Sequence, residues 1–255
     1  MKLCIHADDY GFSKAITAGI QDCIKKGYVK SVSVMSVLLE ESDVEFLIQY
    51  SPQLSVGLHF SLTIQCNKYL PPFPHQYALA MATIGRKKYD ACIQKELEYQ
   101  YALLVQKFPF KITHIDTHQH IHILPRIRRI IDRFAKKNHI PYVRQGKSIS
   151  TRFSLKNILY NTLMPAHKDI ALIGLDIMYH AIDYNKLIND IKYAQYKGFK
   201  KLIWITHPGY ATHDPSFTDI YNHQREKEIE LIYKASEYFQ KNNLSICTLT
   251  DLLSA

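Results

Sequence analysis

The chain has 255 residues, of which 47% are hydrophobic and 22% charged, so it can bury a full core and is not globally disordered. Lys and Arg outnumber Asp and Glu by 32 to 23, an excess that suits a basic solvated surface, an acidic substrate or nucleic acid. We expect a solvated surface, because the densest basic cluster, residues 126–133, has the spacing of an amphipathic helix and lacks an accompanying run of base-stacking aromatic residues.

Short β-branched or apolar runs recur along the chain and predict strands. We expect strands at residues 2–7, 31–37, 55–60, 112–118, 141–144, 170–175, 201–206 and 244–248. Amphipathic patterns between them predict helices at residues 13–26, 88–108, 126–137, 184–197 and 225–240. Gly27 is expected just after the first helix, since glycine readily adopts the left-handed conformation that ends a helix.

This alternation predicts one α/β domain that spans residues 1–255. Alternating strands and helices are typical of a parallel sheet with crossover helices. About seven or eight such units favour a single-domain (β/α) barrel of parallel strands, and an open doubly wound sheet is the alternative. The sequence lacks both a G-x-G-x-x-G turn after the first strand and a P-loop, which argues against a nucleotide-binding fold.

A long stretch at residues 65–86 has little periodic pattern and contains Pro71, Pro72 and Pro74. It follows the third predicted strand, and loops in that position of an α/β barrel lie on the catalytic face. We predict that this loop covers the active face and helps to set substrate choice. The alternative is a disordered or dimer-contact insertion.

Two adjacent acids, Asp8 and Asp9, follow the first predicted strand. Neighbouring side chains of a regular strand point to opposite faces. One acid could therefore bind a metal ion while the other faces the substrate, if the chain bends at Gly11. Capping of the next helix is the alternative role, for which Ser13 competes.

Histidines end the third and fourth predicted strands, at His59 and His118. Taken singly, a histidine at a strand end is more often a structural residue. Together with Asp9 they supply two imidazoles and one carboxylate, a donor set of catalytic zinc sites that leaves one position for water. We predict these three residues as ligands of one divalent metal ion. The set suits zinc, whereas additional carboxylates and waters would suit magnesium.

The segment 114–122 places ionisable side chains on alternate residues. They are His114, Asp116, His118, His120 and His122. Side chains of one parity share a strand face, and burying them without partners would cost several kcal/mol each. We therefore expect a metal or catalytic role for this segment. Because the strand is expected to end near His118, we treat His120 as a candidate substrate contact, with a structural role as its alternative.

Two further residues lie at predicted strand ends. His207 precedes Pro208 and Gly209, a turn sequence, so it is either a site residue or a turn histidine bonded to the backbone. Arg144 ends another strand and could hold a phosphate or carboxylate group of a substrate. A surface ion pair is the alternative for Arg144.

The five cysteines predict a reducing compartment. They are Cys4, Cys23, Cys66, Cys92 and Cys247. Their odd number and wide spacing argue against a disulfide framework or a zinc finger. The first residues lack the layout of a signal peptide, and no apolar run approaches the roughly 18 residues that span a bilayer. We expect a cytoplasmic protein.

Four separated motifs resemble the YdjC-like carbohydrate deacetylases. They are Ala-Asp-Asp-Tyr-Gly at 7–11, Gly-Leu-His-Phe-Ser-Leu-Thr at 57–63, Thr-His-Ile-Asp-Thr-His-Gln-His-Ile-His at 113–122 and Thr-His-Pro-Gly at 206–209. The motifs occur in order from the first strand to past residue 207, and they are specific only in combination. The resemblance implies a deacetylase-type (β/α) barrel and metal-dependent removal of acetyl groups from N-acetylated sugars.

The resemblance also implies residue roles. It implies Asp9, His59 and His118 as metal ligands, Asp8 as the general base and His207 as the group that assists the leaving amine. One departure concerns His207, because relatives often carry an acidic residue shortly before the His-Pro pair, and residues 202–205 here are Leu-Ile-Trp-Ile. A carboxylate that orients His207 must come from elsewhere, and Asp251 is the candidate.

The predicted reaction is hydrolysis of the acetamide of an N-acetylated mono- or oligosaccharide or sugar conjugate, with no nucleic-acid partner. A homodimer is compatible with the sequence. One alternative is another metal-dependent hydrolase, a phosphoesterase or cyclic amidohydrolase, which the His118-x-His120 spacing permits. Those folds usually place such a pair on the first strand, whereas here it lies mid-chain. The other alternative is a non-catalytic sugar-binding protein.

Overall fold

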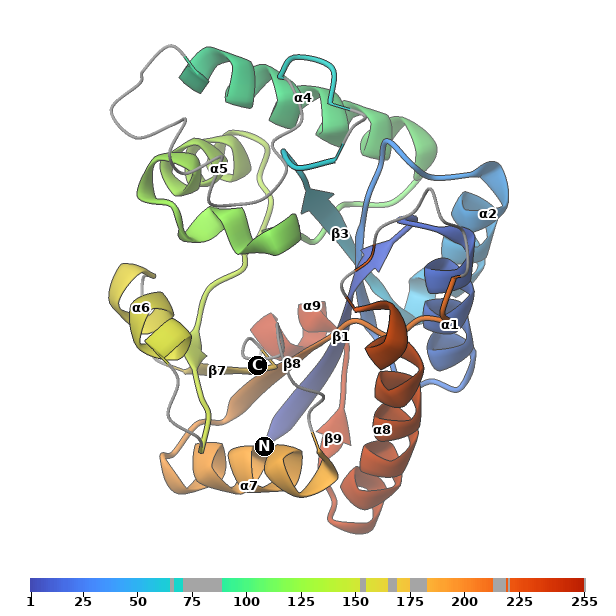
Figure 1. Cartoon of the computed structure of the whole chain (residues 1–255), viewed down its shortest axis with the longest axis vertical. Helices are drawn as coiled ribbons and strands as arrows, with labels where there is room; N and C mark the ends of the chain where they lie inside the picture. Colours follow the sequence, from blue (N-terminus) through green and yellow to red (C-terminus); the bar gives the residue numbers. More distant parts are fainter. Residues whose placement is uncertain are drawn as a thin grey trace.

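Parallel strands form the centre of the fold, and helices surround them (Figure 1). This computed structural model describes residues 1–64, 67–70, 89–151, 155–164, 169–174, 183–212, 219 and 221–254. Within these ranges the strands are β1 (Lys2–Tyr10), β2 (Ser31–Val34), β3 (Ser55–Phe60), β4 (His114–Thr117), β5 (Tyr142–Val143), β6 (Lys147–Ser148), β7 (Ile170–Ile173), β8 (Lys201–Thr206) and β9 (Ser245–Ile246). All the pairings between these strands are parallel.

The strand order is that of a (β/α) barrel. It runs β5-β4-β3-β2-β1-β8-β7-β6, and β9 pairs with the first residues of β1. The ends of this path, β5 and β6, are consecutive in the sequence but do not pair with one another among the described residues. The predicted single-domain barrel of parallel strands is thus confirmed, in an open form. Its carboxyl-terminal edge brings together the ends of β1, β3, β4 and β8.

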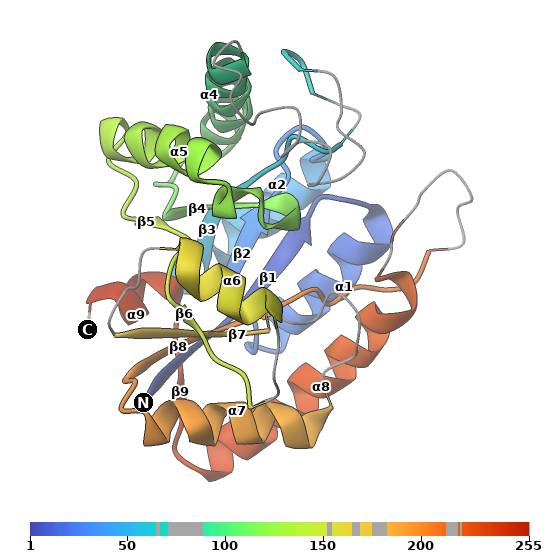
Figure 2. The same cartoon turned by 60° about the vertical axis from the view of Figure 1, so that its left-hand side comes forward.

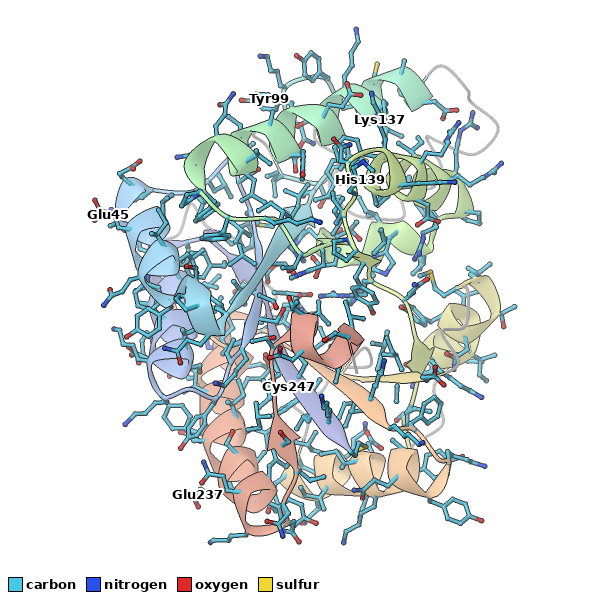
Figure 3. The ribbon with its side chains drawn as sticks, turned by 180° about the vertical axis from the view of Figure 1, so that it is seen from behind. Glu45, Tyr99, Lys137, His139, Glu237 and Cys247 are labelled. Atoms are coloured by element: carbon cyan, nitrogen blue, oxygen red, sulfur yellow. The ribbon has the colours of Figure 1, made fainter. Side chains whose placement is uncertain are left out.

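Helices pack around the sheet in the described part of the chain (Figures 1 and 2). They are α1 (Lys14–Lys25), α2 (Glu41–Tyr50), α4 (Asp90–Lys107), α5 (Pro125–Lys137), α6 (Leu155–Leu163), α7 (Tyr184–Tyr196), α8 (Asn222–Lys241) and α9 (Leu249–Ser254). Short 3-10 segments, η1 (Ser51–Gln53) and η3 (His118–Ile123), complete the path. Exposed charged side chains such as Glu45, Lys137 and Glu237 lie on the outer helices (Figure 3).

The first helix shows how local sequence sets an element. The Ser13 hydroxyl accepts a hydrogen bond from the Ile16 backbone N–H and caps α1, which buries Ile16, Ile20 and Cys23 against the sheet. Gly27 follows the helix with a φ of 74°, as predicted. Helix α5 likewise buries its apolar stripe and exposes most of its basic residues, so the predicted amphipathic helix at 126–137 is confirmed.

Some elements were not predicted. Helix α2 buries only Val44 and Leu47, and β6 has two residues, so neither produces a strong periodic pattern. Helix α6 was missed for a related reason, because Leu155 and Ile158 are exposed and break the apolar stripe. The loop predicted at 65–86 lies almost wholly outside the described residues, which include only 67–70 of it.

The main apolar core lies between the strands and the helices, and a smaller apolar cluster that includes Cys4, Leu172 and Ile203 lies on the inner face of the barrel beside buried polar residues. His6, His114 and Asp116 are buried there. A Cβ atom on Gly57 would lie 2.3 Å from the His114 ring, so only glycine on β3 allows that ring to occupy the interior. In a barrel filled by side chains, these buried polar residues are the part of the interior that needs a specific hydrogen-bond network.

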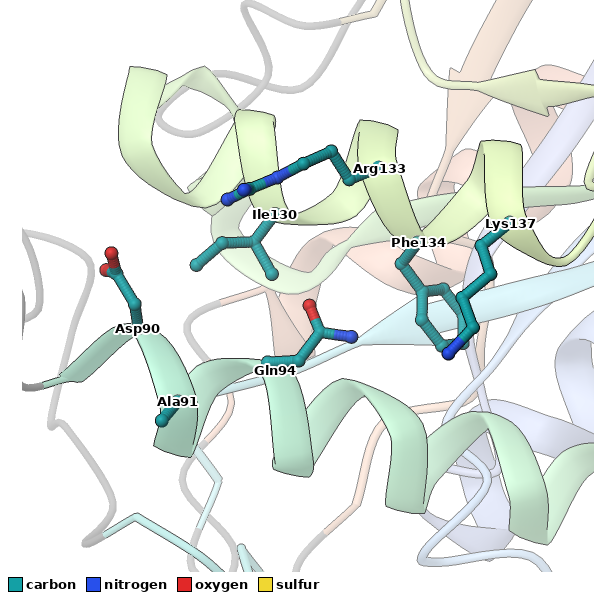
Figure 4. A pocket seen from close by; sticks show the side chains of 7 residues that line it. All are labelled: Asp90, Ala91, Gln94, Ile130, Arg133, Phe134 and Lys137. Atoms are coloured by element: carbon teal, nitrogen blue, oxygen red, sulfur yellow. The ribbon is translucent and has the colours of Figure 1, made fainter.

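A shallow groove between α4 and α5 contains none of the predicted site residues (Figure 4). It is lined by Asp90, Ala91, Gln94, Ile130, Arg133, Phe134 and Lys137. Among the described helices, none is both long and apolar enough to cross a membrane.

Candidate metal centre and active site

The predicted site residues gather at the carboxyl-terminal edge of the sheet. Asp8 and Asp9 lie near the end of β1, His59 near the end of β3, and His207 directly after β8. His118 follows β4 as the first residue of η3. Because β4, β3, β2, β1 and β8 are neighbours in the sheet, their ends meet in one region.

A turn in the backbone directs both acids into this region. Asp9 has a φ of 66°, in the left-handed region, and the β1–β2 register shifts between Ala7 and Tyr10. Asp adopts this conformation more readily than most residues, because its short polar side chain can bond locally. The chain therefore bends at Asp9 before it reaches Gly11, where the bend was expected. As a result Asp8 and Asp9 are both buried in the site.

The three predicted metal ligands lie together. Asp9 Oδ1 is 3.2 Å from His59 Nε2 and 3.0 Å from His118 Nδ1. One donor atom from each of the three residues lies within 4.8 Å of the other two. Burial alone would raise the pKa of Asp9, but hydrogen bonds from His118 and His59 hold it well below its ordinary value. This is a compact set of one carboxylate and two imidazoles.

Asp116 supports the middle member of this set. His59 Nδ1 donates to Asp116 Oδ1 over 2.6 Å, which fixes the ring and directs Nε2 toward Asp9. Histidines that bind metal ions usually donate their second ring N–H to a carboxylate or carbonyl group in this way. Burial would lower the pKa of His59, but the charges of Asp8 and Asp116 raise it to about 10. A metal ion would therefore compete with a proton for Nε2.

Asp8 is held by an arginine. Arg144 donates to Asp8 Oδ2 over 2.7 Å and to Asp8 Oδ1 over 2.5 Å, and it also reaches Asp116 Oδ2 over 2.5 Å. Burial would raise the pKa of Asp8, but the Arg144 guanidinium keeps it well below its usual range, so Asp8 is ionised. Arg144 is itself 3% exposed, and the described hydrogen bonds of its guanidinium are with these carboxylates. Its predicted contact with substrate stays a prediction.

His207 lies beside Asp8. Its Nε2 is 3.7 Å from Asp8 Oδ2, and its ring stacks on Tyr221 with centroids 5.0 Å apart. Glu228 accepts a hydrogen bond from its backbone N–H. Burial lowers the pKa of His207 to about 4, although the charges of Asp8 and Asp9 act in the opposite direction. The imidazole is therefore neutral at pH 7 in the metal-free site.

The suggestion that Asp251 orients His207 is wrong. Asp251 lies on α9, where it is exposed and accepts a hydrogen bond from the Thr248 hydroxyl. Its neighbour Thr250 bonds to Ser55, the first residue of β3, so α9 covers the amino-terminal end of the barrel. His207 lies at the opposite end. Asp251 is close in sequence to the last strand, but this does not determine at which end of the barrel it lies.

The His118-x-His120 pair does not form a chelating unit. The strand ends at Thr117, and Gln119 and His120 both have positive φ, so the side chains no longer alternate. His120 is buried beside His122, with ring centroids 5.8 Å apart. It belongs to none of the groups of potential metal ligands among the described residues. Its predicted role as a substrate contact stays a prediction.

Arg225 on α8 completes an ion-pair network that the sequence analysis missed. It donates to Asp9 Oδ2 over 2.9 Å and to Asp219 Oδ2 over 2.5 Å. Arg144 in the same way joins Asp8 and Asp116. Four carboxylates thus share two guanidinium groups, which leaves two negative charges before any histidine is protonated. A divalent cation would balance that excess.

The sequence contained a sign of this network. Arg225 and Glu228 fall on the stripe of α8 that also buries Ile229, Ile232 and Phe239. Charged residues are almost never fully buried unless they are paired, so their place on an apolar stripe marks them as candidates for a site. Helical periodicity could have revealed both residues, but the carboxylates that Arg225 pairs with could be identified only from the fold.

Glu228 is expected to make the stability of the protein depend on pH. Burial raises its pKa to about 7, while the bond from His207 and the charge of Arg225 act against this. Between the ordinary glutamate pKa and 7, the native carboxyl stays protonated while the unfolded one ionises, so stability falls as pH rises. Glu228→Gln is expected to remove this loss of stability. Above pH 7 its free energy of unfolding should be roughly 3 kcal/mol higher than that of the parent protein.

Urea unfolding of the metal-free protein from pH 4 to pH 8 would measure the effect. Glu237→Gln on the same helix is the matched control, because Glu237 is exposed and should leave the pH dependence unchanged (Figure 3). Equal pH slopes for Glu228→Gln and the parent protein would contradict the prediction.

Comparison with known proteins places this chain in a family. The family model described as YdjC-like protein matches residues 2–240. The chain belongs to the YdjC-like family. The YdjC-like protein is 26% identical to a carbohydrate deacetylase of Clostridium beijerinckii, over 99% of this chain and 100% of that one. It is 28% identical to a chitooligosaccharide deacetylase of Proteus mirabilis, over 92% and 91% of the two chains.

A solved structure supports the fold of the YdjC-like protein. An Enterococcus faecalis protein named for cellobiose-phosphate cleavage superposes with a TM-score of 0.76 at 19% identity, over 98% of both chains. At that identity the likeness concerns the fold alone. It agrees with the strand order described above.

Proposed function

We propose that the YdjC-like protein is a carbohydrate deacetylase that uses one divalent metal ion to hydrolyse the acetamide of an N-acetylated mono- or oligosaccharide or sugar conjugate. The observation that carries this proposal is the set formed by Asp9 Oδ1, His59 Nε2 and His118 Nδ1, with Asp116 behind His59. The names of the Clostridium and Proteus relatives support the substrate class.

The residues present fit a divalent ion. Asp9, His59 and His118 would hold it, and the two negative charges left by the ion-pair network would favour a dication. Two imidazoles and one carboxylate suit zinc, whereas magnesium would call for more oxygen ligands. When bound, such an ion supplies Lewis-acid polarisation of the acetamide carbonyl and lowers the pKa of a water molecule beside it.

Asp8 is the proposed general base. Arg144 holds its carboxylate in one orientation and keeps it ionised, so an oxygen is ready to accept the proton of the attacking water. The same ion pair makes Asp8 a weaker base. Asp8 can therefore take the proton of the attacking water only if the pKa of that water is lowered. In this proposal Arg144 acts as a positioning residue for Asp8.

His207 is proposed to deliver a proton to the departing sugar amine. Because its imidazole is neutral at pH 7, it must take up that proton during the reaction. Asp8 Oδ2, at 3.7 Å from Nε2, is the nearby group expected to carry the proton of the water. Stacking on Tyr221 and the bond between Glu228 and its backbone hold the ring in place for this transfer.

The proposal keeps the single catalytic domain over residues 1–255, with the loop at 65–86 over the active face as a determinant of substrate choice. Contact of His120 or Arg144 with substrate, a cytoplasmic location and a homodimer also remain predictions. Two-metal hydrolysis is less favoured, because Arg144 already lies between Asp8 and Asp116, the carboxylates that a second ion would need.

Acetate release tests the proposed function. The purified protein is freed of metal by a chelator, reloaded with zinc or magnesium, and incubated with N-acetylglucosamine and its oligomers. Parallel reactions contain a phosphate monoester and a cyclic amide. We expect acetate release that depends on the added ion. Hydrolysis of the ester or the cyclic amide without acetate release would favour another metal hydrolase, and sugar binding without any turnover would favour a binding protein.

A further inference from the structure

The two oxygens of Asp9 have different partners. Oδ1 faces His59 Nε2 at 3.2 Å and His118 Nδ1 at 3.0 Å. Oδ2 accepts a hydrogen bond from Arg225 Nη2 over 2.9 Å. Both Asp9 and Arg225 are buried, at 2% and 1% exposure, so water does not compete for these contacts. The carboxylate is therefore divided between a cluster of imidazoles and a guanidinium group.

Arg225 is itself fixed on several sides. Its Nε donates to Asp219 Oδ2 over 2.5 Å, and its Nη1 donates to the backbone carbonyl of His207 over 3.2 Å. Its guanidinium lies over the Tyr221 ring, 5.7 Å from the centroid. An arginine fork held this way has little freedom to turn, so it cannot release Oδ2 without breaking several contacts. It also joins Asp9 to the segment that carries His207.

From this geometry we infer that Arg225 is a positioning residue that reserves Asp9 Oδ2 and so makes Asp9 a ligand through Oδ1 alone. The inference rests on the proposed function, and it concerns how the metal site keeps room for its substrates. A carboxylate with both oxygens free can bind an ion through both, which occupies an additional coordination position. Occupation of Oδ2 by Arg225 leaves that position for water or the acetamide oxygen.

Loss of Arg225 is expected to affect ion binding and catalysis in opposite directions. Removal of Arg225 takes a positive charge away from the ion and frees the second oxygen of Asp9, and both changes favour ion binding. The variant should therefore bind the ion at least as tightly as the parent protein, yet catalyse more slowly. A merely structural role of Arg225 would instead weaken ion binding together with the fold.

The test variant is the double substitution Arg225→Met, Asp219→Asn. Replacing both partners avoids leaving the Asp219 carboxylate buried and unpaired. It also removes one positive and one negative charge together, so a change in ion binding reports the freed oxygen of Asp9 and not a change in net charge. Cobalt(II) serves as the probe, because its visible absorption per ion is stronger in four-coordinate sites than in five- or six-coordinate ones. We expect one bound cobalt ion, an affinity at or above that of the parent protein, weaker absorption per ion and a kcat lower by roughly tenfold or more.

A matched control and a milder variant keep the outcome interpretable. Arg126→Met, Asp90→Asn removes another arginine with its aspartate, joined over 2.5 Å at the groove between α4 and α5 away from the predicted site residues, and should keep the parent cobalt spectrum. Arg225→Lys keeps the charge but cannot bridge Asp9, Asp219 and the His207 carbonyl together. It should change the spectrum and kcat in the same direction, and it serves alone if the double variant does not fold.

Parent-like cobalt absorption and kcat in the folded Arg225 variants would overturn the inference. So would weaker ion binding accompanied by a lower Tm of the metal-free protein, since that result indicates a structural role. If the parent protein itself bound no divalent ion, the proposed function would fail and this inference with it. Ion binding by the parent without any difference in the variants would remove the inference alone.

Discussion

His59→Ala and His118→Ala are each expected to lower bound divalent metal from about one ion per chain to nearly none, because either change leaves only two of the three ligands. His118→Ala is the cleaner test. The His118 side chain is 15% exposed and its described hydrogen bond is to Asp9, so its removal disturbs the fold little. His59→Ala also leaves Asp116 without a partner at Oδ1, and this is expected to cost roughly 1–3 kcal/mol of stability.

Metal content after dialysis against a buffered zinc solution measures this effect, and thermal unfolding of the metal-free proteins checks that each variant is folded. The control is His139→Asn. His139 is exposed in the turn after α5, and asparagine tolerates its φ of 54° (Figure 3). This control should keep the full metal content. Unchanged stoichiometry in both ligand variants would remove His59 and His118 from the metal site.

Asp8→Asn is expected to keep the metal and the fold while it lowers activity by about 100-fold or more, since an amide cannot accept the proton of the attacking water. The asparagine side chain has the same shape and can still accept one hydrogen bond from Arg144 through its oxygen, while its amide NH2 group faces the other guanidinium N–H and loses that bond. Arg144 also retains its bond to Asp116 Oδ2, so the guanidinium is not left unpaired. The main loss should therefore appear in kcat, beside a smaller loss of stability at Arg144.

Asp9→Asn is the matched comparison, because it replaces a carboxylate by an amide at the neighbouring residue. It should lose metal affinity, whereas Asp8→Asn should not. Metal stoichiometry and acetate release measured on both variants separate the two roles. A folded Asp8→Asn protein that has lost its metal, beside an Asp9→Asn protein that retains it, would mean that the two acids have the reverse assignment.

Much of the fold could be predicted because its determinants are local. The runs at 2–7, 55–60 and 201–206 are strands, and the helical patterns around 13–26 and 126–137 are helices, within a residue or a few at each end. When one stripe of a helix or one strand is buried, its apolar residues recur with a fixed period in the sequence, and this pattern can be read without the tertiary structure. Helix α6 was missed because its exposed Leu155 and Ile158 do not follow that pattern.

The place of the candidate site was predictable for a related reason. In a parallel sheet every strand points the same way, so residues at the carboxyl ends of β1, β3, β4 and β8 must meet at one edge. Asp8, Asp9, His59, His118 and His207 could therefore be grouped from their positions in the sequence alone. The YdjC-like motifs indicated the same residues.

Partnerships between charges were decided only by the tertiary structure. Which carboxylates Arg144 and Arg225 would pair with, and that Asp251 would lie at the other end of the barrel, depend on distances across the sheet. The positive φ at Asp9 could not be predicted either, because an aspartate only permits this conformation, whereas the local register shift imposes it. Electrostatic contacts leave no periodicity in a sequence, so chain order can predict which groups approach the site but not which of them pair.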